Sequence, residues 1–130
     1  MSKLIRVLIV DDQPRARQSL KVLLGTCPQV KEVREAALAR EALRMMEESP
    51  LDLVLMDVQM PEMDGLQATR LIKAKWPQVK VIVLTLYAEY AAAAQAAGAD
   101  AFICKGEPAE KLLTTLIEVA SVQNKRGATS

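Results

Sequence analysis

The sequence predicts an α/β fold built on a doubly wound parallel sheet. Short apolar runs alternate along the chain with longer segments of helical periodicity, which is typical of successive βαβ units. The runs are apolar at nearly every position, as expected of parallel strands covered on both faces. With 130 residues, 51% of them hydrophobic, the chain is sized for one domain with a single core.

Five strands are predicted, four of them from the apolar runs. The remaining strand is weaker and charged, and this composition favours an edge position in the sheet. In chain order the predicted strands cover residues 7–10, 30–35, 53–56, 79–84 and 101–104, the second being the charged one. Because crossovers between parallel strands are right-handed, the connecting helices are expected to cover both faces of the sheet.

Five helices are predicted from periodicity and from residues typical of helix ends. Pro14 and Pro108 suit the first turn of a helix, Pro77 ends the third helix, and Gly98 follows the fourth where a left-handed cap is expected. The predicted helices cover residues 14–24, 39–48, 66–76, 88–97 and 108–122. We therefore expect one domain over residues 1–122, and a tail or the start of a linker over residues 123–130.

The composition excludes several classes of function. A net charge of +1 and an aromatic content of 3% provide no basic footprint for nucleic acid or anionic membrane and no platform for base stacking. The chain has no histidine, which removes His-based triads, His-ligated zinc and a phosphohistidine of its own. No apolar run reaches about 18 residues and the start does not resemble a signal peptide, so no membrane association is expected.

The cysteines indicate a reducing compartment. Cys27 and Cys104 lie far apart without the spacing of metal ligands, and Cys104 lies in an apolar run where a buried free thiol is expected. We therefore expect a cytoplasmic protein.

Polar residues follow the predicted strands at the sheet edge where ligands bind in open α/β folds. Asp11 and Asp12 follow the first strand, Asp57 the third, Thr85 the fourth and Lys105 the fifth. Since the carboxyl ends of parallel strands meet at one edge, we expect three carboxylates, a hydroxyl and an ammonium group to share one pocket.

Such a pocket needs cations, because two like charges about 4 Å apart repel by about 4 kcal/mol at an effective dielectric constant of about 20. Lys105 supplies one positive charge. Mg²⁺ would supply the rest, since it takes oxygen ligands from one or two carboxylates and leaves positions for water and phosphate. An aspartate in this setting is suited to attack phosphorus while the cations neutralise the transferring group.

Each of these residues, taken singly, also has a purely structural interpretation. Asp12 is a candidate cap for the helix that follows it, and Asp64 is a candidate cap for the third helix. Thr85 alone is typical of a strand-end hydroxyl bonded to backbone, and Lys105 alone is typical of a solvated charge. The convergence of all five residues on one edge favours the shared pocket.

Four short segments are jointly specific. They are residues 7–12 (VLIVDD), 55–65 (LMDVQMPEMDG), 84–85 (LT) and 98–105 (GADAFICK). With these segments the chain resembles the receiver domains of bacterial response regulators from about residue 5 to residue 122. The resemblance implies a flavodoxin-like (βα)5 fold with strand order 2-1-3-4-5. It also implies a switch that promotes its own phosphorylation and dephosphorylation, rather than an enzyme acting on a separate substrate.

The resemblance implies a role for each residue of the pocket. Asp57 would accept the phosphoryl group, and Asp12 and Asp57 would bind Mg²⁺ directly. Asp11 would act on the metal mainly through water, and the backbone carbonyl of Gln59 would add a further ligand. Lys105 would bond the phosphoryl oxygens.

The resemblance also implies a route for the signal. Thr85 would bond the phosphoryl group, and Phe102 would swing inward when Thr85 moves. This would alter the face formed by the fourth helix, the fifth strand and the fifth helix. The same face is a candidate surface for a homodimer of the phosphorylated protein.

The partners implied are a sensor histidine kinase as phosphodonor and an output of two-component signalling. Residues 84–87 (LTLY) and the pair Lys105-Gly106 resemble receivers of the NarL/LuxR type, which usually carry a C-terminal helix-turn-helix for transcription regulation. Residues 123–130 are too few for such a domain. The alternatives are a stand-alone receiver and a receiver cut from a longer regulator, and neither is expected to bind DNA through this domain.

Two other functions are alternatives to this one. A Mg²⁺-dependent phosphatase of the haloacid dehalogenase type also uses an aspartate, a threonine and a lysine at strand ends, but that family has Asp-x-Asp after the first strand and an acidic pair after the lysine. Here Asp11 and Asp12 are adjacent, and only Glu107 and Glu110 follow Lys105. The other alternative is an adaptor that needs no phosphate, which the intact pocket argues against.

Overall fold

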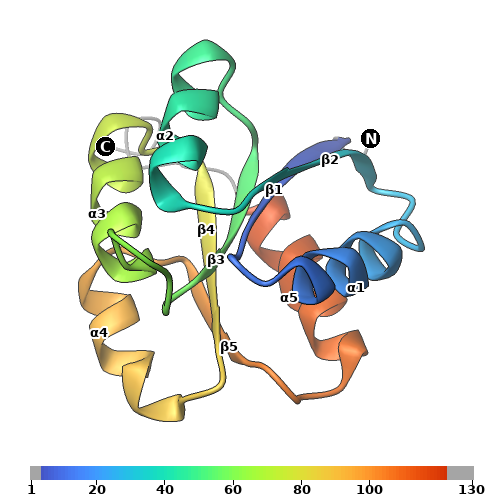
Figure 1. Ribbon diagram of the computed structural model, residues 1–130. Helices are drawn as coiled ribbons and strands as arrows, with labels where there is room; N and C mark the ends of the chain where they lie inside the picture. Colours follow the sequence, from blue (N-terminus) through green and yellow to red (C-terminus); the bar gives the residue numbers. More distant parts are fainter. Residues whose placement is uncertain (1–3, 123–130) are drawn as a thin grey trace.

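The buried apolar runs form the strands of one parallel sheet (Figure 1). The computed structural model describes residues 4–122. The strand order is β2-β1-β3-β4-β5, so the predicted fold class and order are confirmed, and the charged strand β2 lies at an edge as predicted. The strands are β1 (Ile5–Val10), β2 (Val30–Ala36), β3 (Leu53–Asp57), β4 (Lys80–Thr85) and β5 (Ala101–Cys104).

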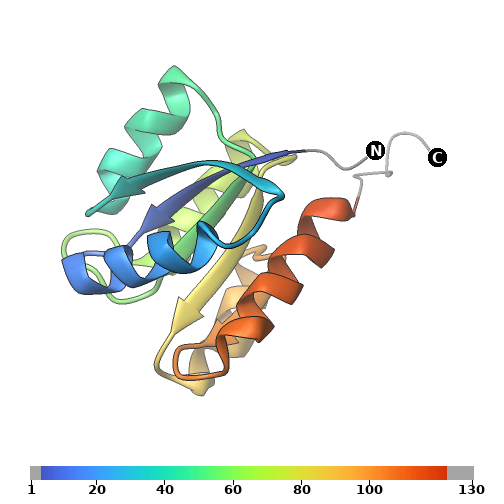
Figure 2. The same cartoon turned by 90° about the vertical axis from the view of Figure 1, so that its right-hand side faces the viewer.

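Helices cover both faces of the sheet. One layer consists of α2, α3 and α4, and the other consists of α1 and α5, which lie in front of the sheet in Figure 2. The helices are α1 (Pro14–Leu24), α2 (Ala39–Glu48), α3 (Gly65–Lys75), α4 (Ala91–Ala96) and α5 (Ala109–Ser121).

Alternate residues of the central strands pack against opposite layers. In β3, Val54 and Met56 join the core beneath α2 and α3, whereas Leu53 and Leu55 join the core beneath α1 and α5. Successive side chains of a strand point to opposite faces, so a strand covered on both sides must be apolar at every position. Complete burial of one such side chain stabilises the fold by about 1.5–3 kcal/mol, which explains why the apolar runs predict the sheet so well.

Three strands end one residue later than predicted, and two of them, β3 and β4, end at predicted site residues. β3 ends at Asp57 and β4 ends at Thr85, so these residues are the last members of their strands. Asp57 pairs with Leu84 of β4, and Thr85 pairs with Cys104 of β5. The backbone of the sheet therefore holds both residues directly.

The fourth helix differs most from its prediction. A 3-10 turn, η1 (Ala88–Tyr90), precedes the six-residue helix α4. In this turn the Tyr90 N–H donates to the carbonyl of Tyr87, and the two rings meet edge to face at a centroid distance of 6.3 Å. The turn is therefore tighter than an α-helix. Gly98 follows α4 with φ 97°, in the predicted left-handed conformation.

The structure confirms the predicted cap at Asp64, removes the alternative in which Asp12 caps α1, and corrects the predicted position of Pro108. Asp64 caps α3, because its Oδ1 accepts a hydrogen bond of 2.8 Å from the Gln67 N–H. Asp12 does not cap α1, whose N-cap residue is Gln13. Pro108 is the N-cap residue of α5 rather than part of its first turn, because its ψ of 143° keeps it extended.

The cysteines are both free thiols, but their burial differs from the prediction. Cys27 is buried, whereas Cys104 is half-buried because β5 lies at the second edge of the sheet. Among residues 4–122, no helix is both long and apolar enough to cross a membrane. The predicted tail over residues 123–130 lies outside the described residues.

Candidate functional site

Three carboxylates converge at the carboxyl end of the sheet. Asp11 directly follows β1 and Asp57 ends the neighbouring strand β3, so the pairing of Val10 with Met56 brings them to the same edge. Asp12 is the next residue of the loop after β1. Oxygen atoms of the three carboxylates all lie within 4.8 Å of one another. The predicted convergence of these residues is thus found in the structure.

Lys105 reaches this cluster from the far edge of the sheet. Its backbone N–H donates to the Thr85 carbonyl at 2.7 Å, which extends the pairing of β5 with β4 by one residue. Its Nζ lies 2.9 Å from Asp11 Oδ2 and 3.4 Å from Asp57 Oδ1. A strand-end backbone and a long side chain therefore place the ammonium group between two carboxylates.

The two strand-end carboxylates differ in how fully their oxygens are engaged. Asp11 is 1% exposed, and its Oδ1 accepts from the Gln13 N–H at 2.9 Å while its Oδ2 accepts from Lys105. Asp57 is 8% exposed and has the longer contact with Lys105. Asp57 is therefore the more accessible carboxylate of the pair.

The pocket carries more negative than positive charge unless a further cation binds. Burial raises the pKa of Asp57, repulsion from Asp11 raises it further, and Lys105 offsets only part of the effect. Burial alone would lower the pKa of Lys105, but its hydrogen bond to Asp11 and the charge of Asp57 raise it above the usual value. One ammonium group thus faces three carboxylates.

This donor set fits a hard divalent cation. Clustered carboxylate oxygens are the ligands that Mg²⁺ prefers, and the half-buried Asp12 leaves one side of the cluster open to solvent. Gln59 is exposed in the loop that directly follows β3, two residues after Asp57. That loop is fixed by a 2.8 Å hydrogen bond from the Gly65 N–H to the Val58 carbonyl.

Thr85 and Phe102 lie on neighbouring strands and on one face of the sheet. Val83 pairs with Phe102 and Thr85 pairs with Cys104, so the two residues are diagonal neighbours. Thr85 is 1% exposed, and its hydroxyl accepts a 3.3 Å hydrogen bond from the Tyr87 N–H. Phe102 is half-buried and packs against the core of the α2–α4 layer. Thr85 thus also has the backbone bond expected of a strand-end hydroxyl.

Comparisons with known proteins decide the family. Residues 7–117 match the family described as the response regulator receiver domain. The chain belongs to this family. Receivers are phosphoacceptor switches of two-component systems, and this assignment removes the phosphatase alternative.

The receiver is similar to parts of longer regulators. It is 41% identical over 113 residues to the transcriptional regulatory protein YhcZ of Bacillus subtilis and 38% identical over 110 residues to the response regulator protein VraR of Staphylococcus aureus. The alignments cover 85% and 83% of this chain but 53% of each relative, so the chain spans about half the length of these curated relatives.

A solved structure agrees with this assignment. The two-component response regulator of the LuxR family from Aurantimonas sp. SI85-9A1 superposes with a TM-score of 0.85 at 29% identity, covering 91% of this chain and 86% of that one. The predicted likeness to LuxR-type receivers is therefore confirmed.

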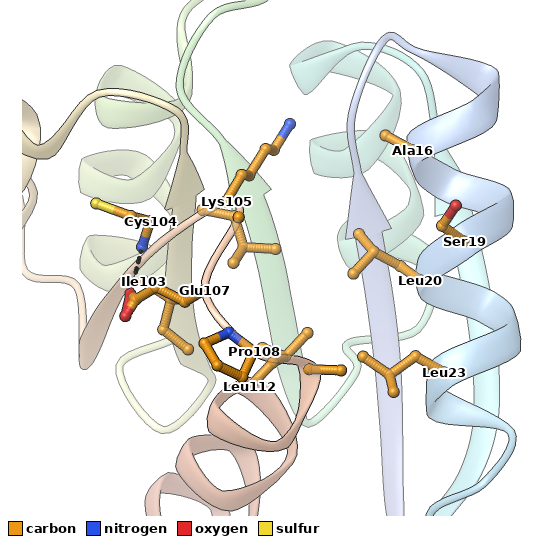
Figure 3. A pocket seen from close by; sticks show the side chains of 13 residues that line it. Ala16, Ser19, Leu20, Leu23, Ile103, Cys104, Lys105, Glu107, Pro108 and Leu112 are labelled. Atoms are coloured by element: carbon orange, nitrogen blue, oxygen red, sulfur yellow. Dashed lines mark hydrogen bonds between the residues drawn. The ribbon is translucent and has the colours of Figure 1, made fainter.

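An apolar cavity of about 360 Å³ lies beside the acidic cluster of the receiver, between α1 and α5 (Figure 3). Leu20, Leu23 and Leu112 line its interior, and Lys105 stands at its rim with Nζ directed away from them. Such a lining offers a phosphoryl group few polar partners. This cavity is therefore poorly suited to hold a phosphoryl group.

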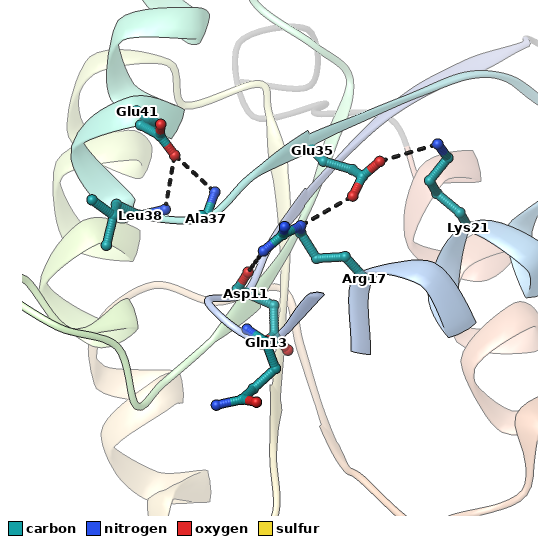
Figure 4. Close-up of polar contacts among 8 residues, drawn as sticks. All are labelled: Asp11, Gln13, Arg17, Lys21, Glu35, Ala37, Leu38 and Glu41. Carbon is teal, nitrogen blue, oxygen red and sulfur yellow. Dashed lines mark hydrogen bonds and ion pairs between the residues drawn. The ribbon is translucent and has the colours of Figure 1, made fainter. Parts of the chain in front are cut away.

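Two contributors to the acidic site were missed in the sequence. Arg17 Nη1 donates a 2.6 Å hydrogen bond to the backbone carbonyl of Asp11, and Arg17 Nε donates a 3.0 Å bond to Glu35 Oε1 (Figure 4). In the sequence, Arg17 lies in the first turn of the predicted first helix, and Glu35 lies at the end of the predicted second strand. Neither residue follows a buried strand, so reasoning from strand ends did not reach them.

Proposed function

We propose that this receiver accepts a phosphoryl group on Asp57 from a sensor histidine kinase and thereby switches an output of two-component signalling. The observation that supports this most directly is the setting of Asp57, which lies beside Lys105 and within 4.8 Å of two other carboxylates. Asp11 is less suited as acceptor, because both of its carboxylate oxygens already accept hydrogen bonds.

The proposed reaction uses the charges of the pocket. An oxygen of Asp57 forms a bond to phosphorus while the phosphorus–nitrogen bond of the kinase's phosphohistidine breaks, and the electron pair of that bond stays on the histidine. Lys105 Nζ, 3.4 Å from Asp57 Oδ1, would neutralise charge on the phosphoryl oxygens. The carboxylates of Asp12 and Asp57 and the carbonyl of Gln59 would hold Mg²⁺, with Asp11 acting mainly through water. The bound metal would supply further charge neutralisation.

The proposed switch runs through Thr85. A phosphoryl group adds roughly 1.5 to 2 negative charges at Asp57, and the Thr85 hydroxyl would exchange its bond from the Tyr87 N–H for a bond to this group. The movement would make room for Phe102 on the adjacent strand. The face of α4, β5 and α5 would then change, and it is our candidate surface for a homodimer of the phosphorylated protein.

The proposed boundaries are a receiver over residues 1–122 and a tail or the start of a linker over residues 123–130. The matched region covers 53% of each of two longer proteins, and one of them is named a transcriptional regulatory protein, which supports transcription regulation as the output. The net charge of +1 supports an output in which this domain itself does not contact DNA. Free thiols at Cys27 and Cys104 fit the proposed cytoplasmic location.

Phosphorylation of Asp57 can be tested with acetyl phosphate and Mg²⁺. Intact mass spectrometry should show one added phosphoryl group on the wild type and none on Asp57→Asn or after chelation of Mg²⁺. Asp64→Asn is the matched control, since asparagine also caps a helix well, and it should be labelled like the wild type. Unchanged labelling of Asp57→Asn would contradict the assignment, and an unlabelled wild type would favour the adaptor alternative.

The metal site can be tested separately by calorimetry. Asp12→Ala should weaken Mg²⁺ binding by more than about ten-fold, because loss of even an outer partner of a metal ligand has an effect of this size. Asp64→Asn should bind Mg²⁺ as the wild type does. Wild-type affinity in Asp12→Ala would remove Asp12 from the metal site.

A further inference from the structure

We propose that Arg17, held in place by Glu35, is a positioning residue that orients the peptide between Asp11 and Asp12 and thereby sets the affinity of the acidic site for Mg²⁺. This inference rests on the proposed function. It concerns two residues to which the proposed function gives no role, and their contacts link α1 and β2 to the residue that follows β1.

Every polar group of Asp11 is bound to a different part of the structure. Its N–H donates to the Ala36 carbonyl at 3.1 Å, and its carbonyl accepts from Arg17 Nη1 at 2.6 Å. Its two carboxylate oxygens accept from the Gln13 N–H and from Lys105 Nζ. The bond from Gln13 spans Asp12 from the side-chain side, and the contact with Arg17 holds the carbonyl of the peptide between Asp11 and Asp12 directly.

That peptide carries the next residue of the site. The carbonyl of Asp11 and the N–H of Asp12 belong to one rigid plane, so holding the carbonyl also fixes the direction in which Asp12 leaves the strand. Asp12 is half-buried and directly precedes Gln13, the N-cap residue of α1. The side chain of Gln13 makes no capping hydrogen bond to the helix. The placement of Asp12 therefore depends strongly on this peptide.

Arg17 is itself held in place (Figure 4). Its Nε donates to Glu35 Oε1 at 3.0 Å, and Glu35 Oε2 lies 3.1 Å from Lys21 Nζ. The side chain of Arg17 is only 18% exposed. Hydrogen bonds from Lys21 and Arg17 lower the pKa of Glu35, so its carboxylate stays ionised opposite both cations. The fork of the guanidinium lets one side chain bind Glu35 and the Asp11 carbonyl at the same time.

Mg²⁺ makes the site sensitive to such positioning, since it requires near-ideal octahedral geometry. A rotation of the Asp11–Asp12 peptide would move the Asp12 carboxylate relative to Asp57, and the oxygens now within 4.8 Å of one another would no longer converge. A positioning role and a purely electrostatic role of Arg17 predict opposite changes in Mg²⁺ affinity when Arg17 is replaced. Loss of its positive charge alone would strengthen Mg²⁺ binding, whereas loss of positioning would weaken it.

The test is calorimetric titration of the whole chain with MgCl₂. Arg17→Met should weaken Mg²⁺ binding by roughly ten-fold, the effect typical of removing a residue that orients a metal ligand. Arg15→Met removes the same charge from an exposed position of the same helix, and it should bind Mg²⁺ at least as tightly as the wild type. Arg17→Lys keeps the charge but not the fork, so its affinity should lie between those of Arg17→Met and the wild type.

Two further measurements separate positioning from a loss of folding. In metal-free Arg17→Met, hydrogen exchange of the Asp11 and Gln13 amides should accelerate while exchange in β3 and β4 stays at the wild-type rate. Glu35→Gln should weaken Mg²⁺ binding in the wild-type background and have no added effect in Arg17→Met, because it acts through Arg17.

The outcomes distinguish the two proposals. Wild-type or tighter Mg²⁺ binding by Arg17→Met overturns the positioning role and leaves the proposed function intact. An equal loss of Mg²⁺ affinity in Arg15→Met and Arg17→Met also overturns the positioning role. Faster amide hydrogen exchange throughout the chain in both Arg17→Met and Arg17→Lys overturns it as well. Absence of Mg²⁺ binding and of Asp57 labelling in the wild type overturns the proposed function itself.

Discussion

Asp57 carries a charge that the metal-free fold disfavours. Burial and the neighbouring Asp11 carboxylate raise its pKa, and the ammonium group of Lys105, 3.4 Å away, offsets only part of this. A raised pKa means that the folded state binds the proton more tightly than the unfolded chain does. The cost to stability is therefore absent in acid and grows as the pH rises through the folded-state pKa.

Removing this charge should stabilise the metal-free protein. At pH 7 in EDTA we expect Asp57→Asn to raise the free energy of unfolding by on the order of 1 kcal/mol, the scale of repulsion between two solvated charges in contact. Urea denaturation measures this directly. The gain should shrink when excess Mg²⁺ is added, because the wild type then gains binding energy that the variant lacks.

Asp64→Asn is the control for this stability experiment, and its urea midpoint should match the wild type in both buffers. A metal-free Asp57→Asn variant less stable than the wild type would show that the ionised carboxylate contributes favourable contacts exceeding its burial and repulsion.

The connection between β3 and α3 positions the backbone of Asp57, the proposed phosphoacceptor. A Cβ added at Gly65 would lie 1.9 Å from the backbone carbonyl oxygen of Asp57, so the helix starts against the end of the strand. Asp64 caps this helix start, and the Thr69 hydroxyl donates to the Gly65 carbonyl at 2.7 Å. Glycine at position 65 thus allows the close approach that holds the Asp57 backbone.

Gly65→Ala should therefore disturb both stability and chemistry. The added methyl group meets backbone rather than a movable side chain, so we expect a loss of about 1–3 kcal/mol or more in urea unfolding. Labelling by acetyl phosphate should also slow, since the strand end must shift. Gly25→Ala is the control, because its nearest neighbours would lie 3.3 Å away and its φ of −63° suits alanine. Equal stability of both variants would contradict the close-approach argument.

At the level of the complete fold, the proposed signal leaves the acidic pocket through neighbouring strands. Thr85 ends β4, and Phe102 lies diagonally from it on β5, against the core that α4 covers. Helix α4 has six residues, of which only Ala94 is fully buried. Few buried side chains hold this short helix, so we expect it to be displaced at low cost.

Hydrogen exchange with and without beryllofluoride tests this route. The wild type should show a change around residues 91–97 when beryllofluoride occupies the Asp57 site. Thr85→Ala should still be phosphorylated at Asp57 by acetyl phosphate but should lose this change, because the hydroxyl that senses the group is gone. An equal exchange response in the wild type and Thr85→Ala would mean that the signal leaves the pocket by another route.

The sheet and the residues of the pocket were predictable from the sequence. Strands covered on both faces must be apolar throughout, and the carboxyl ends of parallel strands meet at one edge, so residues directly after the apolar runs converge whatever the details of packing. Asp11, Asp57 and Lys105 were predictable for this reason. The capping role of Asp64 was predictable because it depends on local backbone geometry.

The contacts within the pocket depend on how distant parts of the chain pack together. The closer pairing of Lys105 with Asp11 than with Asp57 depends on how far a long side chain reaches across the sheet. The Arg17–Glu35 contact joins α1 to β2, and no local pattern encodes it. The exposure of Cys104 follows from the edge position of β5. These features depend on residues distant in sequence, and packing of the complete chain brings such residues together.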